Sequence, residues 1–435
     1  MVEETLELGR DEPIAQAANF RIGDYLWCEP DYRQILLWAE ALKMEPLAVI
    51  EKLSGYGGTE FRDGRIISLS WNLKELPLSD FATVAGLVIE RLCLFPGDTG
   101  NTKRNRFPFH MPSLRTLICL KCKWTMLDLV GVPNLSELQC GDNGLTELDL
   151  SHVSNLLELH CYDNSLTELN LSHVPKLTIL KCWGNAAKLD LSCVPNLTKL
   201  SCARAQVLQI DLSHVPNLSY FWCLGHDSVG LSWFDLSCCP SLTELHCRYN
   251  NITKLDLSLV PNLTSLHCGD NKLTKLDLQH VPNLTDLECA GIPLSGLDLS
   301  RFVKLTKLDC SRSQVTKFDL SLVPNLTELD CSHNHLTILD LQHVPNLTEL
   351  DCHFNQLTNL DLQHVPNLTE LDCSFNQLTN LDLSFVPNLT KLRCNRNGLT
   401  GLDIRPLVHL KELHYDHGGP LLQGPEHAGQ VKRYG

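Results

Sequence analysis

Cysteine recurs along this chain at a nearly constant interval, and this interval constrains the fold more than any other feature of the sequence. Most steps are 21 residues long, apart from one of 20 residues after Cys182 and one of 24 residues after Cys223. A fixed period of this length is typical of a solenoid, in which each unit is too small to bury its own apolar face and packs against its neighbours. Tyr415 continues the register of the ladder cysteines, which are Cys119, Cys140, Cys161, Cys182, Cys202, Cys223, Cys247, Cys268, Cys289, Cys310, Cys331, Cys352, Cys373 and Cys394.

One regular unit, from Leu326 to Leu341, predicts the two walls of a coil. Leu329 and Cys331 alternate with polar residues, as in a strand whose apolar side chains face inward. Asn334 tolerates a tight turn, and its side chain can bond to main-chain groups of adjacent coils. The Leu-Asp-Leu segment that follows predicts a second short inward-facing segment on the opposite wall. Only a few residues, one of them proline, lead to the next coil, so we expect short strands and turns there and no helix.

The pattern Leu-x-x-Leu-x-Cys-x-x-Asn-x-Leu resembles the shared segment of the leucine-rich repeat family, with Cys at one consensus Leu position. The Leu-Asp-Leu after it is similar to the short 21-residue repeats found largely in bacteria, sometimes called IRREKO repeats. The resemblance runs from about Gly64 to Tyr415 and implies a mainly β repeat solenoid, with parallel strands on the concave face and short strands and turns on the convex face. For function, it implies a non-enzymatic surface that binds a protein. Four coils lack the Asn and are expected to interrupt its ladder, at Ala205, His226, Ile292 and Ser313.

Three zones are predicted along the chain. Residues 1–63 are not repetitive, and helices are predicted at Pro30–Leu42 and Pro46–Leu53, with a weaker one starting near Asp11 and Pro13. We expect this helical N-terminal cap to cover the first coil. Residues 64–415 are predicted to form a solenoid of about 17 coils, irregular to about residue 118 and regular from residue 119. Residues 416–435 are expected to be a flexible tail.

Charge and cysteine placement exclude several classes of function. The net charge of −15 argues against nucleic-acid binding, which needs clustered Lys and Arg. Ladder thiols that project in one direction cannot converge into disulfides, which points to a reducing compartment. The N-terminus lacks a basic segment followed by an apolar core, and no long apolar run occurs. We therefore expect a cytoplasmic monomer, or one delivered into a host cytosol by a non-classical secretion route, without membrane insertion.

No catalytic, metal or cofactor site is predicted. Zinc takes four converging ligands, whereas the ladder thiols line up in a row and are expected to pack as core. Cys119 and Cys122 have Cys-x-x-Cys spacing and Cys238 and Cys239 are adjacent, but no second pair accompanies either. The Asp of Leu-Asp-Leu forms another column, which either binds calcium or caps main-chain groups while facing water; we favour capping. This column includes Asp128, Asp149, Asp190, Asp211, Asp235, Asp256 and Asp277, and continues to Asp403.

The residue before each ladder cysteine is expected to point outward, where packing does not dictate its identity. Its character changes halfway along the solenoid, from aromatic and mixed to acidic. Glutamates two residues earlier, at Glu328, Glu349 and Glu370, add to the acidic half. The residues are Gln139, His160, Lys181, Ser201, Trp222, His246 and His267, then the acidic stripe Glu288, Asp309, Asp330, Asp351 and Asp372, and finally Arg393.

Aromatic residues gather on outward positions between Cys161 and Cys247, while Phe221 takes a Leu position and is expected in the core. Exposed Trp and Tyr in a cluster are typical of protein-binding hot spots; the alternative is that they cover defects left by irregular coils. We predict that the strand-lined face recognises an unidentified partner protein and that the chain acts as a bacterial effector or scaffold. The predicted partner-binding residues are Tyr162, Trp183, Tyr220, Trp222, Tyr249, His160, Lys181, His246 and His267.

The acidic stripe supports an alternative function. Some cysteine-rich members of the family that this chain resembles act as acidic inhibitors, and the resemblance therefore implies that the stripe masks a basic enzyme. Charge-driven binding of this kind falls steeply with salt, whereas binding through the aromatic residues does not. The stripe is equally compatible with a repeat sequence that was copied without selection for binding.

Overall fold

The structure is a computed structural model. It divides into two compact units, Met1–Leu166 and Thr167–Gly435, which are taken in turn. The helix expected near Asp11 and Pro13 lies outside the described residues, as do Ala205 and His226. The described residues are 20–55, 57–72, 87–95, 110–186, 188–203, 210–225, 230–294, 299–317, 319–416, 420–424 and 432–434.

The first unit begins with a small helical region. Both predicted helices are present, as α1 (Glu29–Leu42) and α2 (Pro46–Gly55). Pro lies at the start of α1, where its missing N–H is tolerated, and Lys43 ends the helix in the left-handed conformation. A hairpin that the sequence did not predict precedes them, formed by the antiparallel strands β1 (Phe20–Ile22) and β2 (Tyr25–Trp27).

Helix α1 is fixed to the first strand of the repeats. The fully buried Asp31 side chain accepts a hydrogen bond from the Ile66 N–H at 2.8 Å and lies 3.0 Å from the Arg65 guanidinium. Trp38 of the same helix packs on Trp71, with ring centroids 4.9 Å apart. These contacts join the cap to the apolar end of the repeats, which would otherwise be open to water.

The strands of the first unit form a parallel ladder after one antiparallel pair. Strand β3 (Glu60–Arg62) runs antiparallel to β4 (Arg65–Asn72). Strands β4 to β8 then pair in sequence order, all parallel, as expected when each coil adds one strand. The later strands are β5 (Arg91–Phe95), β6 (Thr116–Ile118), β7 (Glu137–Gln139) and β8 (Glu158–His160).

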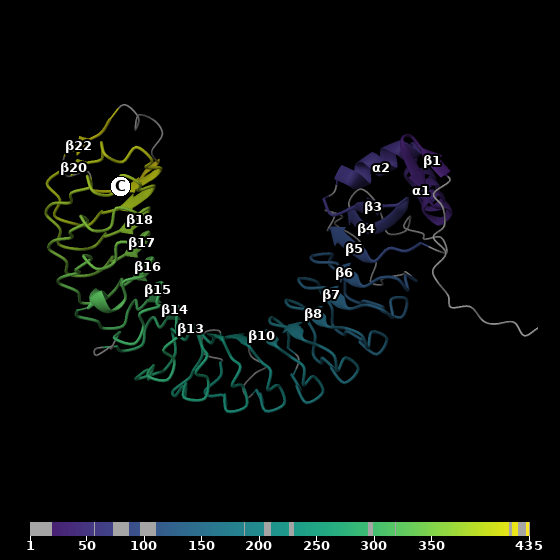
Figure 1. The fold of residues 1–435 in the computed structure, drawn as a ribbon, viewed down its shortest axis with the longest axis horizontal. Coiled ribbons are helices and arrows are strands. Elements are labelled where there is room, and N and C mark those ends of the chain that lie inside the picture. Colours follow the sequence, from purple (N-terminus) through teal and green to yellow (C-terminus); the bar gives the residue numbers. More distant parts are fainter. Residues whose placement is uncertain are drawn as a thin grey trace, which may run out of the picture. The chain divides into compact units, whose positions relative to one another are not determined.

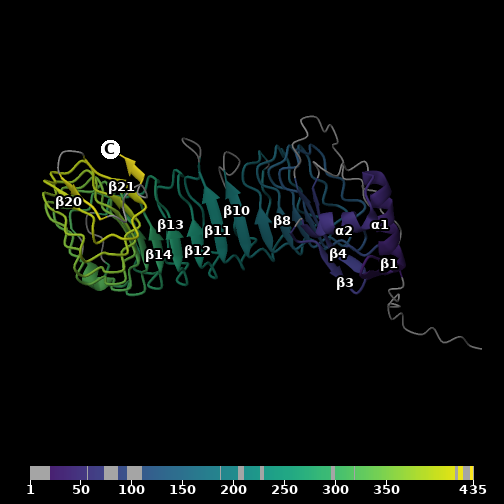
Figure 2. The same cartoon turned by 90° about the horizontal axis from the view of Figure 1, so that it is seen from above.

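The second unit has the same architecture, with neighbouring strands in parallel register (Figures 1 and 2). On the other wall, turns predominate and include the 3-10 helix η2 (Leu320–Leu322), in agreement with the prediction that no α-helix fits there. The strands of the main ladder are β9 (Ile179–Lys181), β10 (Lys199–Ala203), β11 (Tyr220–Leu224), β12 (Glu244–His246), β13 (Ser265–His267), β14 (Asp286–Glu288), β15 (Lys307–Asp309), β16 (Glu328–Asp330), β17 (Glu349–Asp351), β18 (Glu370–Asp372), β19 (Lys391–Arg393) and β21 (Glu412–His414).

The C-terminal segment 416–435, predicted as a flexible tail, contributes two short strands. Strand β22 (Leu421–Leu422) pairs in parallel with β20 (Leu402–Asp403), and β23 (Lys432–Tyr434) pairs in parallel with β21. The Gly- and Pro-containing sequence suggested turns, whereas the open edge of the last coil offers unpaired main-chain groups that these strands satisfy.

The ladder cysteines face inward, as predicted. All fourteen are buried, and every one of the twenty cysteines is a free thiol. Burial raises the pKa of the Cys140 thiol to about 12, because the low-dielectric interior disfavours the thiolate. Phe221 is also fully buried, as its Leu position indicated. Among the cysteines, Cys193 and Cys238 alone are partly exposed.

Asparagine side chains join successive coils, which confirms the role predicted for them. The Asn334 amide donates to the carbonyls of Cys310 and Cys331 at 3.0 and 2.9 Å, and its oxygen accepts from the Val315 N–H at 2.9 Å. At one coil without the Asn, the Ser313 hydroxyl donates to the Cys289 carbonyl at 3.3 Å and restores part of this bonding.

The Asp column on the other wall has the predicted capping role. Each carboxylate named above accepts a hydrogen bond from the N–H two residues later, as in Asp149 with Ser151 at 2.9 Å. Asn170, the exception in this column, makes the same contact with Ser172 at 3.0 Å. No helix in the described part of the chain combines the length and the apolar character that crossing a bilayer requires.

Candidate functional site

The residues before the ladder cysteines form one continuous row in the second unit. Parallel pairing places Trp222 of β11 opposite His246 of β12, and His246 opposite His267 of β13. The same register holds through β19, so the change from aromatic to acidic residues happens along a single line. This outer row is Lys181, Ser201, Trp222, His246, His267, Glu288, Asp309, Asp330, Asp351, Asp372 and Arg393.

The first part of the row belongs to an aromatic patch, defined here as Trp183, Tyr220, Trp222, His246 and His267. The Trp183 and Trp222 rings lie 6.0 Å apart between centroids, and the Tyr220 and His246 rings 5.5 Å apart. His246 and His267 meet edge to face at 4.3 Å, with their Nδ1 atoms 3.0 Å apart. These side chains are half-buried, so neighbours hold them in place while part of each remains open to solvent.

Two further predicted residues of the second unit flank this patch. Lys181 is half-buried on β9. Tyr249 is exposed and has a left-handed backbone, with a φ of 54°. The Arg248 guanidinium lies 4.9 Å from the centre of the Tyr249 ring and donates to its hydroxyl at 3.0 Å, so this ring is held by a cation–π contact.

The remaining two predicted residues belong to the first unit. The His160 side chain is only 9% exposed, and its Nε2 lies 2.7 Å from Glu158 Oε1, so this ring offers little surface to a partner. Tyr162 is half-buried over Gly141. A Cβ atom at Gly141 would lie 2.6 Å from the Tyr162 ring, which shows how closely the ring packs on the main chain.

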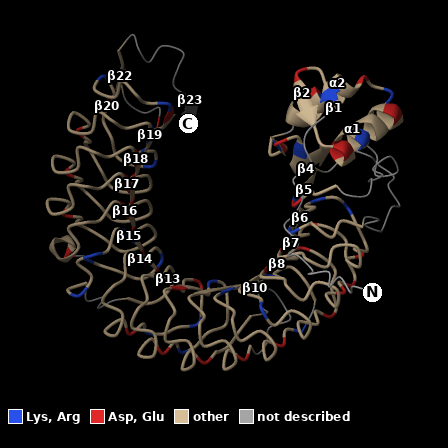
Figure 3. Cartoon of the chain, turned by 45° about the vertical axis from the view of Figure 1, so that its right-hand side comes forward, with Lys and Arg blue, Asp and Glu red and all other residues tan. Residues whose placement is uncertain are grey.

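The acidic part of the row lines a groove of about 540 Å³ on β13 to β19. Nine carboxylates and four Lys or Arg side chains line it, and Figure 3 marks the charged residues of these strands. We call this surface the acidic groove. Its carboxylates are Asp286, Glu288, Asp309, Glu328, Asp330, Glu349, Asp351, Glu370 and Asp372.

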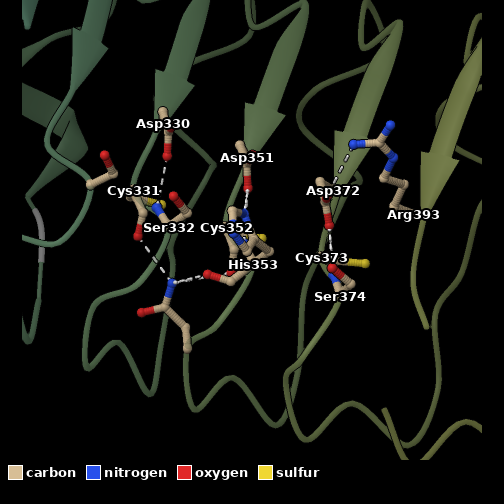
Figure 4. Close-up of polar contacts among 12 residues, drawn as sticks. Asp330, Cys331, Ser332, Asp351, Cys352, His353, Asp372, Cys373, Ser374 and Arg393 are labelled. Atoms are coloured by element: carbon tan, nitrogen blue, oxygen red, sulfur yellow. Dashed lines mark hydrogen bonds and ion pairs between the residues drawn. The ribbon is translucent and has the colours of Figure 1, made fainter. Parts of the chain in front are cut away.

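Ion pairs occupy both ends of the acidic groove. At one end, the Arg248 guanidinium pairs with Glu288. At the other end, Arg393 Nη1 lies 3.8 Å from Asp372 (Figure 4). Two lysines pair with glutamates beside the row, Lys307 with Glu328 at 2.6 Å and Lys391 with Glu370 at 3.0 Å.

The centre of the groove carries less compensated charge. Within the described residues, Asp309, Asp330 and Glu349 form no ion pair with Lys or Arg. Asp330 instead accepts a hydrogen bond from the Ser332 N–H at 2.9 Å, closing the strand with a tight turn (Figure 4). Burial raises the pKa of the Asp330 carboxyl to about 6; hydrogen bonds from Ser332 lower it, and the neighbouring carboxylate of Asp351 raises it further.

Three groups with metal-binding chemistry meet beside Asp330. The ligand atoms of Asp351, His353 and Asp372 all lie within 4.8 Å of one another, and no other such trio occurs in the part of the chain that the structure describes. His353 Nδ1 lies 2.5 Å from Asp351 Oδ1, and this hydrogen bond raises the pKa of the imidazole. The hydrogen bond between His353 and Asp351 already joins two of these three groups.

Sequence reasoning missed a second aromatic feature. His333, Phe354 and Phe375 each lie two residues after a ladder cysteine and have positive φ angles. Their rings stack in parallel, with centroids 4.5 Å apart for His333 and Phe354 and 4.0 Å apart for Phe354 and Phe375. We call these three residues the aromatic column. The signal in the sequence was the recurrence of an aromatic residue directly before the ladder Asn.

Comparisons with known proteins show which family has this architecture. Models of leucine-rich repeats match residues 240–280, 324–364 and 367–389. The chain is 32% identical to the functional domain of InlJ from Listeria monocytogenes, which includes a cysteine ladder. That alignment has a TM-score of 0.63 and covers 74% of this chain and 73% of that one. This chain belongs to the leucine-rich repeat family. No curated protein matches it by sequence.

Other leucine-rich repeat structures share the fold of this protein. One is a protein of Leptospira interrogans, with a TM-score of 0.62, 20% identity, and coverage of 74% of this chain and 90% of that chain. Another is YopM from Yersinia enterocolitica, with a TM-score of 0.56, 22% identity, and coverage of 93% and 100%. Leucine-rich repeat proteins commonly mediate protein–protein interactions and are typically binding scaffolds without enzymatic activity.

In this leucine-rich repeat protein, replacing Asp330 by Asn is expected to raise the free energy of unfolding at about pH 7.5 by about 1–2 kcal/mol. Between the ordinary pKa of 3.8 and about 6, the folded state binds more protons than the unfolded state. The contribution of Asp330 to stability therefore falls as pH rises through this window. Asn removes the charge and keeps an oxygen for the Ser332 N–H. Chemical denaturation should show little gain at about pH 4.

The control for this change is Asp382→Asn. Hydrogen bonds from the Ser384 side chain and main chain lower the pKa of the exposed Asp382 carboxyl, so its stabilising contribution is present at neutral pH and lost on acidification. Asp382→Asn should therefore lower stability at about pH 7.5. A gain of similar size in both variants would contradict the assignment of a desolvated charge to Asp330.

Proposed function

We propose that this protein is a non-enzymatic module that recognises a partner protein on the strand face of its second unit. The observation that supports this most is the aromatic patch, in which rings from β11, β12 and β13 and from the turn after β9 contact one another across neighbouring strands. In protein interfaces, a few residues contribute most of the binding energy, and Trp and Tyr are enriched among them. The regular coils beside the patch need no such residues for packing.

The patch is ordered before a partner arrives. Trp183 and Trp222 pack against each other, and His267 lies 2.9 Å from Asp286 and 3.2 Å from Glu288. A partner therefore meets side chains that have already lost much of their rotamer freedom, which lowers the entropy cost of association. We assign Trp183, Tyr220 and Trp222 as anchors, with Lys181, His246 and His267 setting specificity.

The cellular setting is part of the same proposal. Twenty free thiols, eighteen of them buried, suit a reducing compartment better than an oxidising one. We propose that the protein works in a cytoplasm, either in the cell that makes it or after delivery into a host as a bacterial effector. Tyr249 stays in the proposal as a flanking contact of the patch. Tyr162 stays as a separate contact on the first unit, and the buried His160 is not retained.

Trp222→Ala should weaken partner binding by about 2 kcal/mol or more, or roughly thirtyfold in Kd, without unfolding the repeats. The reason is that the indole is one of the two largest rings of the patch. Proteins captured by the wild-type chain from candidate host and source lysates would be identified and purified. Their Kd would then be measured by calorimetry for wild type and variant.

Trp233→Ala is the matched control. This indole is 56% exposed and lies among turn residues of the other wall, beside Asp211 and Asp235. Its removal should leave the Kd within about twofold of wild type. Equal affinity of the Trp222 variant and wild type would remove the aromatic patch from the proposed interface.

A second candidate function uses the acidic groove. Nine carboxylates against four cationic side chains suit an inhibitor that covers a basic enzyme, the alternative that the acidic stripe suggested. Its affinity for a captured enzyme should fall steeply between low and high salt. Binding that does not change with salt would eliminate this candidate and leave the aromatic patch.

A further inference from the structure

The acidic groove and the aromatic column lie next to each other on the same coils. Asp330 and His333 flank Cys331, and Asp351 and Phe354 flank Cys352. We propose that this surface binds an extended, Lys- or Arg-rich segment of a partner protein, with its cationic groups at the groove carboxylates and its aliphatic stems against the aromatic column. The inference rests on the proposed function, protein recognition by the strand face, and names the chemistry of the partner.

The acidic groove is complementary in charge to a basic segment. The chain's own cations neutralise the groove at its two ends, through Arg248 and through Arg393. The central carboxylates Asp309, Asp330 and Glu349 have no such partner within the described residues. Parallel strands lie about 4.8 Å apart, so these acceptors repeat along the groove at a spacing that flexible Lys and Arg side chains can follow.

The chain's own arginines already occupy one end of this surface. Arg393 approaches the Asp372 carboxylate at 3.8 Å, and the Arg396 guanidinium lies 6.0 Å from the centre of the Phe375 ring. One carboxylate and one ring of the preceding coil thus contact two guanidinium groups three residues apart in the sequence. They show which ligand groups this combination of carboxylate row and aromatic column accepts.

The aromatic column also limits the alternatives. Phe354 and Phe375 are 42% and 38% exposed, yet stacking uses the faces between them. A sugar ring would need a free aromatic face, whereas the methylene stems of Lys and Arg can pack along the ring edges. The exposed edges next to a carboxylate row therefore favour a basic peptide segment.

The partly buried Asp330 adds a pH dependence. Burial raises the pKa of its carboxyl to about 6, and the groups around it include Asp309, Asp351 and the Ser332 hydrogen bonds. A bound cation would relieve the penalty of this charge. Affinity for the basic segment is therefore expected to rise as pH increases through about 6, as Asp330 loses its proton.

Fluorescein-labelled hexalysine and hexaarginine are suitable probes for the intact protein. Fluorescence anisotropy at low salt should give saturable binding that weakens as salt is added, and hexalysine acetylated on every side chain should not bind. Asp330→Asn combined with Asp351→Asn should weaken binding at least about tenfold. Phe354→Asn, which tolerates the left-handed backbone, should weaken it by about threefold or more.

Matched variants separate local contacts from overall charge. Asp340→Asn combined with Asp361→Asn removes the same charge from the other wall, where both carboxylates are exposed turn caps, and should change the Kd less than about twofold. Equal weakening by the two double variants, or binding of acetylated hexalysine, would overturn the proposal.

Trp222→Ala keeps this test distinct from that of the proposed function. Unchanged peptide binding in this variant is expected, because Trp222 lies outside the groove lining. Loss of peptide binding in it would place the peptide on the aromatic patch and overturn the inference. Absence of peptide binding by the wild type, combined with Trp222-dependent binding of a captured partner, would overturn the inference alone and leave the proposed function in place.

Discussion

Replacing Asn355 by Ala is expected to lower the free energy of unfolding by about 3 kcal/mol or more. This buried amide donates to the carbonyls of Cys331 and Cys352 at 3.0 and 3.1 Å, and its oxygen accepts from the Leu336 N–H at 3.0 Å. Ala leaves the Leu336 N–H without this partner in the interior, where water cannot replace it. It also removes one of the two amide donors from each cysteine carbonyl, because only Asn334 still donates to Cys331 and only Asn376 to Cys352.

Circular dichroism during chemical denaturation would measure this loss. Asn367→Ala is the matched control, because Asn367 is exposed and its amide makes a single hydrogen bond, to the Pro345 carbonyl at 3.2 Å. We expect the control to lose less than about 1 kcal/mol. Similar losses in the two variants would mean that the buried Asn ladder does not hold the coils together.

The second large effect concerns thiol reactivity. A thiol reagent such as 5,5′-dithiobis(2-nitrobenzoic acid) should modify Cys193 and Cys238 in the native protein and leave the eighteen buried cysteines unmodified until unfolding. The protection has two causes: the reagent cannot reach the buried sulfurs, and burial raises the pKa of thiols such as Cys182 and Cys394 to about 12. The absorbance of the released product would count the reactive thiols.

The double variant Cys193→Ser, Cys238→Ser should show almost no labelling in its native state. After unfolding, its remaining eighteen thiols should react, as the same eighteen do in the wild type. Mass spectrometry of the labelled wild type would locate the modified cysteines. Rapid labelling of most ladder thiols would reverse the assignment of inward and outward positions. The aromatic patch and the acidic groove would then no longer be surfaces.

The period made most of the fold predictable. Once Cys331 and Leu329 are assigned inward, strand alternation places Asp330 outward, and a constant interval places its equivalents beside it in neighbouring coils. The Asn role and the Asp caps followed from turn chemistry in the same way. The β1–β2 hairpin did not, because it lies before the repeats and has no second copy to reveal its pattern.

The candidate site was only partly predictable. The identity of the outer row followed from register, but the pairing of Arg248 with Glu288 joins residues two coils apart and depends on where a long side chain points. The aromatic column was missed because Phe354 and Phe375 lie in a turn, where strand alternation gives no direction. His160 takes an outward position yet is buried, with its Nε2 2.7 Å from Glu158 Oε1, and strand alternation alone does not reveal this.

The Asn junctions also bear on how such a chain changes length. Asn334 and Asn376 each donate to the cysteine carbonyls of their own and the preceding coil, so these junctions are chemically interchangeable. Gain or loss of one whole 21-residue unit would bring together two coils that make the same Asn hydrogen bonds, and it would leave every other junction unchanged. Unequal recombination within the near-identical C-terminal units would thus adjust the reach of the molecule in single steps, without requiring the rest of the chain to adapt.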